Sequence, residues 1–236
     1  MGVDVKITTF SRILDLLAPF SCRGCGRLGS LLCDCCKNYN MRQIVKICPR
    51  CRKSQKKCSC KEKVYAVFYR DGVLLKLTED YKYKSIRKTA EVLAELMDAA
   101  IPKDLGYDEG KGVAVVPLPT ISRHVRERGF DHALLLAKEL ARRRGWKVER
   151  VLTRRNKTVQ VGADEKTRKR QAKEAYEAVG KVDAETTYLL VDDVWTTGAS
   201  MEAATKAIKK AGAKRVASAV ILIPPEESYS DDSDDA

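Results

Sequence analysis

The chain of 236 residues has no apolar run that approaches the roughly 20 residues a helix needs to span a bilayer. Residues 1–20 also lack the basic start and continuous apolar stretch of a secretory signal peptide. We therefore expect no membrane insertion and a cytoplasmic location.

Histidine and aromatic residues are scarce, at two histidines and 6% aromatic side chains. No nucleophilic triad is visible, and we interpret His124 and His132 as loop and helix-start residues rather than catalysts. Aromatic stacking on single-stranded nucleic acid has correspondingly thin support. No histidine lies among the cysteines, which disfavours a catalytic zinc site with an open position.

Charge is unevenly distributed along this chain of net charge +13. Residues 1–63 carry 14 Lys/Arg against 4 Asp/Glu, or +10, and residues 64–225 carry 31 against 22, or +9. Residues 226–236 carry six acids and no base, or −6. The basic body is equally compatible with a polyanionic partner and with a solvated surface. We expect the acidic tail to be disordered.

All nine cysteines lie in residues 22–60, in closely spaced pairs. In a chain without an export signal, paired C-x2-C knuckles are typical of a structural zinc ribbon rather than of disulfides. Eight cysteines make two four-thiolate zinc sites. We assign them as Cys22, Cys25, Cys33 and Cys36, and as Cys48, Cys51, Cys58 and Cys60.

Two features of this assignment stay open. Cys35 is the spare residue and could replace Cys33 or Cys36, and the first knuckle could pair with the third instead of the second. The segment has few large apolar residues, so we predict that it does not fold without metal.

The pattern after residue 62 predicts a separate α/β domain over 63–225. The expected strands are 64–70, 112–119, 146–154, 188–193 and 215–223, and the expected helices begin near Ile86, His132, Thr167 and Ser200. Alternating strands and helices predict a mostly parallel sheet covered by helices on both faces. The domain organisation is therefore 1–62 (double zinc ribbon), 63–225 (α/β domain) and 226–236 (acidic tail).

One stretch carries the strongest functional signal, Tyr188–Ser200, which reads YLLVDDVWTTGAS. A buried strand ends in two carboxylates and turns through Thr-Thr-Gly into a helix. The start of that helix offers unpaired N–H groups and a positive dipole end to a phosphate. The hydroxyls add donors, and Gly198 allows close approach of the backbone. This pattern favours a phosphosugar site over a simple capped turn.

The same stretch resembles the phosphoribosyl-pyrophosphate (PRPP) loop of type I phosphoribosyltransferases. A basic segment, 120–132, follows the strand 112–119 and supplies three arginines: Arg123, Arg126 and Arg128. Strand ends of a parallel sheet meet at one edge, so these guanidinium groups could clamp a pyrophosphate there. The alternative is a basic loop with no ligand.

Further motifs extend the resemblance over residues 22 to about 223. In order they are the cysteine knuckles, YKYK, VVPLP, RERGFDHALLLA, RRNKTVQ, RKRQAKEAY and VDDVWTTGAS. Together they look like the competence-protein ComF family, a double zinc ribbon joined to a phosphoribosyltransferase-like domain. The family usually has Asn-Gln where this chain has Asp131-His132, and Arg-x-x-Asn where Arg168 precedes Gln171.

The resemblance implies roles for particular residues. Asp192 and Asp193 would bind the ribose hydroxyls, directly or through Mg²⁺, and Asp193 and Arg128 would be catalytic. The pyrophosphate candidates are Lys82, Arg123 and Arg126. The phosphate loop comprises Thr196, Thr197, Gly198, Ala199 and Ser200.

Three functions remain open on the sequence. The favoured one is an enzyme that transfers or hydrolyses the phosphoribosyl group of PRPP and releases pyrophosphate. The second is a protein of DNA uptake or repair that binds single-stranded DNA or a DNA-processing partner and retains the PRPP pocket. The third is a regulator that senses PRPP or a nucleotide. The acid pair and Thr-Thr-Gly loop support ligand binding in all three.

Overall fold

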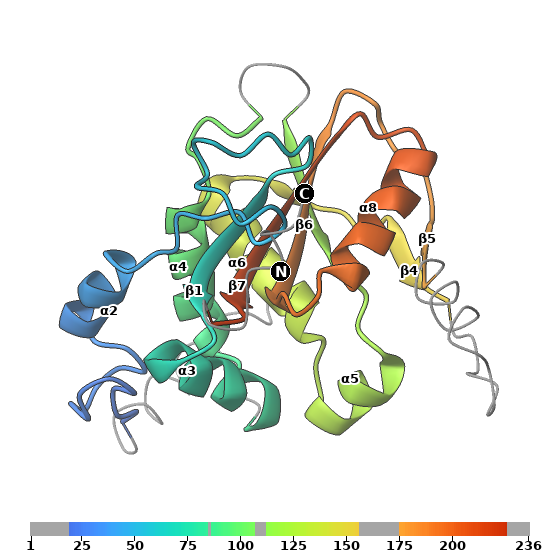
Figure 1. Cartoon of the computed structure of the whole chain (residues 1–236). Coiled ribbons are helices and arrows are strands. Elements are labelled where there is room, and N and C mark those ends of the chain that lie inside the picture. The colour runs from blue at the N-terminus through green and yellow to red at the C-terminus, as the bar shows by residue number, and fades with distance from the viewer. Residues whose placement is uncertain (1–18, 85, 107–111, 156–174, 226–236) are drawn as a thin grey trace, which may run out of the picture. The chain divides into compact units, whose positions relative to one another are not determined.

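A computed structural model describes residues 19–84, 86–106, 112–155 and 175–225 of the chain (Figure 1). The chain divides into two compact units, 1–43 and 44–236. The acidic tail lies outside the described residues. The boundary expected at residues 62–63 stays a prediction, and the second group of cysteines belongs to the larger unit. No helix in the described part of the chain is long and apolar enough to cross a membrane.

The smaller unit consists of a cysteine knuckle followed by helix α2 (Asp34–Met41). An antiparallel bridge joins Ser21 to Leu28, and the Cys22 N–H donates to the Arg27 carbonyl at 2.8 Å. Gly26 takes a φ of +77° in this turn, a value that L side chains rarely adopt. The turn therefore brings Cys22 and Cys25 to one side of a short loop.

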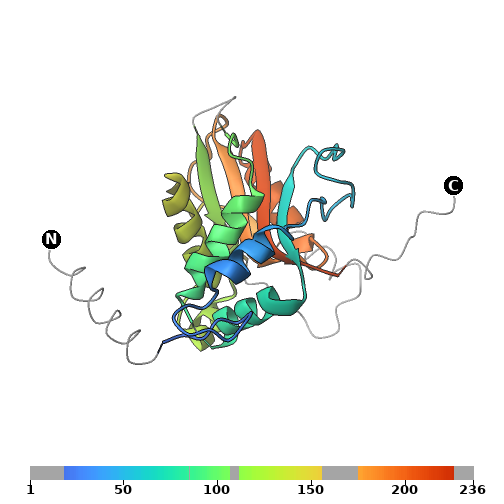
Figure 2. The same ribbon diagram turned by 90° about the vertical axis from the view of Figure 1, so that its left-hand side faces the viewer.

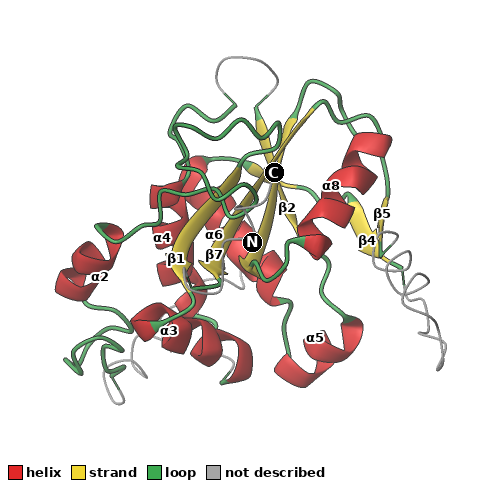
Figure 3. Ribbon diagram, viewed as in Figure 1, coloured by secondary structure: helices red, strands yellow, loops and turns green. Residues whose placement is uncertain are grey.

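The larger unit is built on a five-stranded sheet, coloured yellow in Figure 3. The strand order is β1 (Val64–Tyr69), β7 (Arg215–Ile223), β6 (Thr187–Val194), β2 (Val113–Pro117) and β3 (Lys147–Val148). Every neighbouring pair is parallel. The four long strands are nearly continuous runs of buried residues, as expected when both faces are covered. The predicted parallel α/β fold is confirmed.

Helices cover both faces of the sheet (Figures 1 and 2). Helices α4 (Thr89–Ala100) and α6 (His132–Arg144) pack together on one face, against β1, β2, β6 and β7. Helix α8 (Ala199–Lys210) lies on the other face beside a small antiparallel sheet of β4 (Leu152–Arg154) and β5 (Tyr176–Ala178). The apolar stripe of each helix supplies the core on its side.

Two short helices occupy the carboxyl edge of the sheet. Helix α3 (Gly72–Tyr83) follows β1, and α5 (Ser122–Arg128) follows β2. Figure 1 shows both at the end to which the strand arrows point. In parallel sheets this edge is where ligands bind, so α3 and α5 stand next to the predicted site.

Some predicted elements need correction. The single strand expected over 146–154 is two short strands, β3 and β4, which belong to different sheets. The helix expected over 167–179 lies outside the described residues as far as 174, and its end at 176–178 is the strand β5. Residues 122–128 form α5 rather than a loop, and α3 was missed. The strand errors come from tertiary pairing that local patterns do not encode. Helix α3 had a local signal, because its buried residues Leu74, Leu77, Thr78 and Tyr81 recur at helical spacing.

The second cysteine segment is part of the core of the larger unit. Val45, Cys48 and Cys58 belong to the same buried cluster as residues of β1, β6 and α8. The Gln55 amide donates to the Ile47 carbonyl and to the Val64 carbonyl at the start of β1. These contacts hold the segment against the amino end of β1.

Candidate functional site

The two predicted carboxylates lie at the carboxyl end of β6. Successive side chains of a strand point to opposite faces, and the two acids differ accordingly in burial. The Asp193 side chain is only 4% exposed, whereas that of Asp192 is 20% exposed. The Asp193 N–H donates to Asp192 Oδ1 at 2.9 Å, which fixes the first carboxylate against the backbone. The end of β6 thus presents a fixed acid pair.

Lys82 from α3 forms an ion pair with Asp193 Oδ2. That oxygen is buried and accepts no hydrogen bond of regular geometry from the described residues. Burial lowers the pKa of Lys82 to about 8, with the positive charges of Arg128 and Arg70 acting in the same direction and Asp192 opposing them. Lys82, a predicted pyrophosphate candidate, therefore also neutralises the more buried acid.

His132, the first residue of α6, faces the same acids. Its Nε2 lies 3.9 Å from Asp192 Oδ1 and 3.7 Å from Asp193 Oδ1. Burial, together with Arg128 and Lys82, lowers the pKa of His132 to about 3, so the ring is neutral. Arg128 Nη1 lies 2.9 Å from His132 Nδ1, and because a guanidinium can only donate, Nδ1 is the acceptor. The proton therefore sits on Nε2 and points toward the acid pair.

The surroundings of Asp192 disfavour its charged form. Burial raises its pKa to about 7; Lys82, Arg154 and Arg128 oppose this rise, and Asp131 adds to it. The carboxylate is thus poised to gain stability from a cation or from hydroxyl donors that enter the site. This property fits a group that contacts a ligand.

The loop after the acids contains exposed polar residues and two buried residues, Trp195 and Gly198. Thr196, Thr197 and Ser200 are exposed, and Trp195 packs into the core below them. Gly198 has a φ of +78°, and a Cβ at this position would lie 2.2 Å from the Trp195 ring. Only glycine fits both the backbone angle and the space. The loop therefore closes tightly onto the N-terminus of α8, where Ala199 and Ser200 are exposed.

The three predicted arginines have different surroundings on α5. Arg123 is exposed and pairs with Glu127 through Nε–Oε1 at 2.6 Å. Arg126 is also exposed. Arg128 reaches His132 and lies over the ring of Tyr83 at 5.7 Å. The structure therefore brings Arg128 to the acid pair, while Arg123 and Arg126 remain predictions as pyrophosphate ligands.

A polar pocket of about 250 Å³ lies beside the end of β2. Its lining includes Pro117, Thr120, Asp131, Arg150 and Arg154. Asp131 and Arg154 are the two lining residues whose charges also act on Asp192. Asp131 Oδ1 accepts from the Thr120 hydroxyl and the Leu134 N–H, both at 3.1 Å.

Sequence reasoning missed part of this site, namely His132, Asp131, Arg150 and Arg154. His132 was interpreted as a helix-start residue, which is its place in α6, but its ring also faces the acids. Arg154 stands at the end of the strand predicted over 146–154. Its position at the carboxyl end of a predicted strand could have indicated a site residue.

The acid pair supplies part of the ligand set that a divalent cation needs. Ligating atoms of His132, Asp192 and Asp193 lie within 4.8 Å of one another. Two carboxylates suit the hard ion Mg²⁺, although Asp193 Oδ2 is already paired with Lys82. His132 fits less well as a ligand, because its Nε2 carries the proton. Asp192 and Asp193 are therefore the residues that would hold Mg²⁺.

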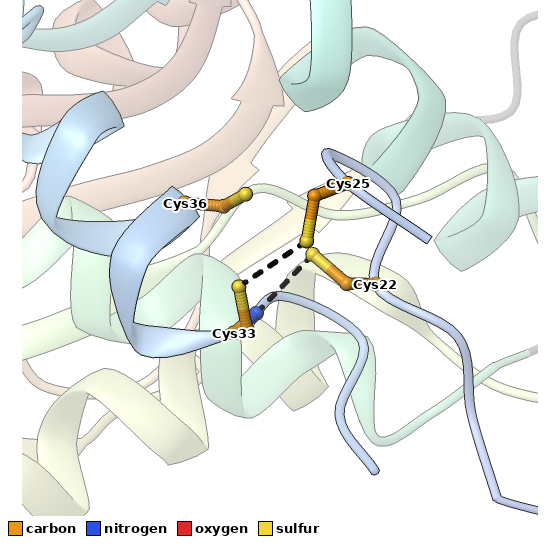
Figure 4. Close-up of side chains that lie close together, drawn as sticks. All are labelled: Cys22, Cys25, Cys33 and Cys36. Carbon is orange, nitrogen blue, oxygen red and sulfur yellow. Dashed lines mark hydrogen bonds between the residues drawn. The ribbon is translucent and has the colours of Figure 1, made fainter. Parts of the chain in front are cut away.

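The first cysteine group gathers Cys22, Cys25, Cys33 and Cys36 (Figure 4). Cys25 Sγ lies 3.6 Å from Cys33 Sγ. A tetrahedral zinc with Zn–S bonds of about 2.3 Å would require sulfur atoms roughly 3.8 Å apart. Cys22 Sγ accepts from the Gly24 N–H at 3.4 Å and the Cys33 N–H at 3.3 Å, contacts that stabilise a thiolate.

The second group gathers Cys48, Cys51, Cys58 and Cys60, with Cys51 Sγ 3.6 Å from Cys58 Sγ. Both groups contain sulfur ligands in the number and spacing that zinc needs. Neither mixes the first knuckle with the third, and Cys35 is exposed and outside both. The two groups could therefore each hold one zinc ion.

Metal analysis of the purified chain tests this arrangement. We expect two zinc ions per chain, because each group supplies four thiolates. Cys22→Ser/Cys25→Ser and Cys48→Ser/Cys51→Ser should each leave one ion. Cys35→Ser is the matched control and should retain two. Loss of zinc from Cys35→Ser would show that the assignment of ligands is wrong.

The raised pKa of Asp192 has a consequence for stability. Its folded pKa of about 7 exceeds the unfolded value near 4, so the folded state binds the extra proton and loses stability as pH rises from 4 through 7. Asp192→Asn removes this loss. Urea unfolding should show the variant more stable than the wild type at pH 8, and the difference should shrink toward pH 4.5. A difference independent of pH would contradict the burial of this charge.

The second part of the chain matches a known protein family. The family profile "Phosphoribosyl transferase domain" matches residues 82–236. No curated protein matches the chain.

Three solved structures resemble the chain weakly. The glutamine PRPP amidotransferase of B. subtilis, complexed with ADP and GMP, has 18% identity and a TM-score of 0.39, and the match covers 61% of this chain and 30% of that one. A purine phosphoribosyltransferase of Pyrococcus horikoshii has 16% identity, a TM-score of 0.35 and coverage of 56% and 75%. The PRPP synthetase of Mycobacterium smegmatis has 18% identity, a TM-score of 0.33 and coverage of 71% and 56%.

The match of the family profile extends over more than half of the chain and contains the acid pair and the loop into α8. The chain belongs to the phosphoribosyl transferase domain family.

Proposed function

We propose that this chain binds PRPP and transfers or hydrolyses its phosphoribosyl group with release of pyrophosphate. One observation carries the proposal. In a chain of this family, a fixed acid pair at the end of β6 leads through a Gly198-centred turn into the exposed start of α8. Carboxylates for two ribose hydroxyls and N–H donors for a phosphate are thus adjacent.

Different residues of the loop and the acid pair would contact the phosphate and the ribose. The side chains of Thr196, Thr197 and Ser200, with the N–H groups of Gly198 and Ala199, would hold the 5′-phosphate. Asp192 and Asp193 would accept hydrogen bonds from the ribose hydroxyls. Mg²⁺, when bound with PRPP, would neutralise charge on the pyrophosphate leaving group.

The chemical step breaks the bond between ribose C1 and the pyrophosphate oxygen, which leaves with the electron pair. A nitrogen nucleophile, or water in hydrolysis, forms the new bond to C1 and loses a proton. The positive charge that develops on the ribose is stabilised by the neighbouring carboxylates, with Asp193 the most enclosed. Arg128 lies at the same edge, where it could contact the leaving group, and Lys82, Arg123 and Arg126 are further candidates for that contact.

We further propose that the whole chain is of the ComF type, with a double zinc ribbon in residues 1–62, a phosphoribosyltransferase-like domain in 63–225 and an acidic tail in 226–236. The supporting observations are the two four-cysteine groups and the family match that follows them.

Pyrophosphate release from PRPP and Mg²⁺ tests the enzyme proposal. Asp192→Ala/Asp193→Ala should reduce the rate at least about 100-fold, because both hydroxyl acceptors and the charge that faces C1 are lost. Glu91→Ala, an exposed acid at the start of α4, should leave it unchanged. Calorimetry should show PRPP binding to the wild type. Binding without release of pyrophosphate would reject hydrolysis of PRPP, since the assay contains water but no nitrogen acceptor.

His132 should act as a positioning residue through its Nε2 proton. His132→Gln retains an N–H donor, so we expect kcat and KM within about threefold of the wild type, whereas His132→Leu should raise the KM for PRPP about tenfold or more. Because the His132 ring stays neutral, the pH profiles of wild type and His132→Gln should coincide between pH 5 and 9. Equal loss in both variants would indicate a packing role instead.

A further inference from the structure

A cavity of about 530 Å³ lies at the amino edge of the sheet, away from the acid pair. It is bordered by the starts of β1, β6 and β7, by the turn after α4, and by the far end of α8. In Figure 1 this edge is opposite to α3 and α5. Its volume lies within the range of small-molecule sites, which is about 300–1,000 Å³.

The cavity concentrates positive charge from separate segments of the larger unit. The cationic lining residues are Lys61, Lys63, Lys209, Lys214 and Arg215, and the acidic ones are Glu62 and Asp104, so five minus two gives +3. Counting Glu185, which pairs with Lys214 and Arg215 from outside the lining, leaves +2.

Two of these cations have no carboxylate partner among the described residues. Lys63 Nζ donates to the Cys58 carbonyl, and Lys61 is exposed without an ion pair in the described part of the chain. Lys209 shares Glu62 with Arg50. The amino edge therefore holds an excess of cations that an anion could satisfy.

The rest of the lining is apolar or aromatic. Tyr65 and Val216 come from adjacent strands of the sheet, and Pro102 and Leu105 come from the turn after α4. A ring and aliphatic side chains beside a group of cations suit a ligand with a flat apolar part and a phosphate. If these cations only offset the charge of the nearby thiolates, none would be needed from α8 and β7. Lys209 and Arg215 come from those two elements.

We propose that this cavity binds a nucleoside phosphate, at a second site distinct from the acid pair. The two sites are separated by α8, whose 12 residues at 1.5 Å each span about 18 Å. Lys209 stands at one end of this helix, and the Thr-Thr-Gly loop stands at the other. The proposal goes beyond the phosphoribosyl chemistry and does not depend on it.

Calorimetric titration of the full zinc-loaded chain with ADP, without added Mg²⁺, tests the proposal. Lys61→Glu/Lys214→Glu reverses two charges of the cavity and should weaken ADP binding at least about tenfold. Lys138→Glu, an exposed lysine of α6, is the matched control and should bind as the wild type does. Asp192→Asn/Asp193→Asn should also retain ADP binding, because the cavity lies at the other edge.

The apolar lining makes a second distinction. ADP should bind more tightly than inorganic pyrophosphate, and equal affinities would overturn a nucleoside phosphate as the ligand. Binding that Asp192→Asn/Asp193→Asn abolishes and Lys61→Glu/Lys214→Glu does not would locate the nucleotide at the acid pair and overturn the site. The absence of saturable ADP binding at low salt would also overturn it. A single-stranded oligonucleotide that binds where ADP does not, with sensitivity to Lys61→Glu/Lys214→Glu, would assign this surface to nucleic acid instead.

Discussion

Two carboxylates held side by side at the buried end of β6 set the main constraint on this molecule. An uncompensated buried charge costs several kcal/mol, so the fold must supply partners from elsewhere in the chain. Lys82 arrives from α3 and pairs with Asp193, and the Nε2 proton of His132 arrives from the start of α6. Asp192 keeps a pKa of about 7, because burial outweighs the opposing charges of Lys82, Arg154 and Arg128. A cation or a hydroxyl donor that enters the site would therefore stabilise the charged form of Asp192.

The same constraint explains the arrangement of the carboxyl edge. Arg128 fixes the tautomer of His132 by donating to Nδ1, and it also lies over Tyr83. The Tyr81 hydroxyl donates to the His132 carbonyl at 2.6 Å from within the core. The side chain and the backbone of His132 are thus held by different elements. Helices α3, α5 and α6 meet at this residue, which makes the geometry around the acid pair rigid.

Sequence patterns predicted the parts of this site that are contiguous in the chain. The alternation of strands and helices gave the sheet, and Asp192, Asp193 and the turn at Gly198 were recognised from thirteen successive residues, 188–200. Long-range partners were harder. Lys82 was identified by resemblance, but its contact with Asp193 joins residues more than a hundred positions apart. The division of 146–154 into β3 and β4 depends on pairing with β2 and β5, which no local periodicity specifies.

The second cysteine group connects the other end of α8 to the sheet. Arg50, between Cys48 and Cys51, pairs with Glu62, and Glu62 also pairs with Lys209 near the end of α8. The Lys209 hydrogen bond, with Arg50 as a second cation, lowers the pKa of Glu62, so this junction stays ionised at neutral pH. Cys48 and Cys58 are buried against the same core as Ile208. The cysteine segment therefore holds the far end of α8, the helix whose other end begins at the Thr-Thr-Gly loop.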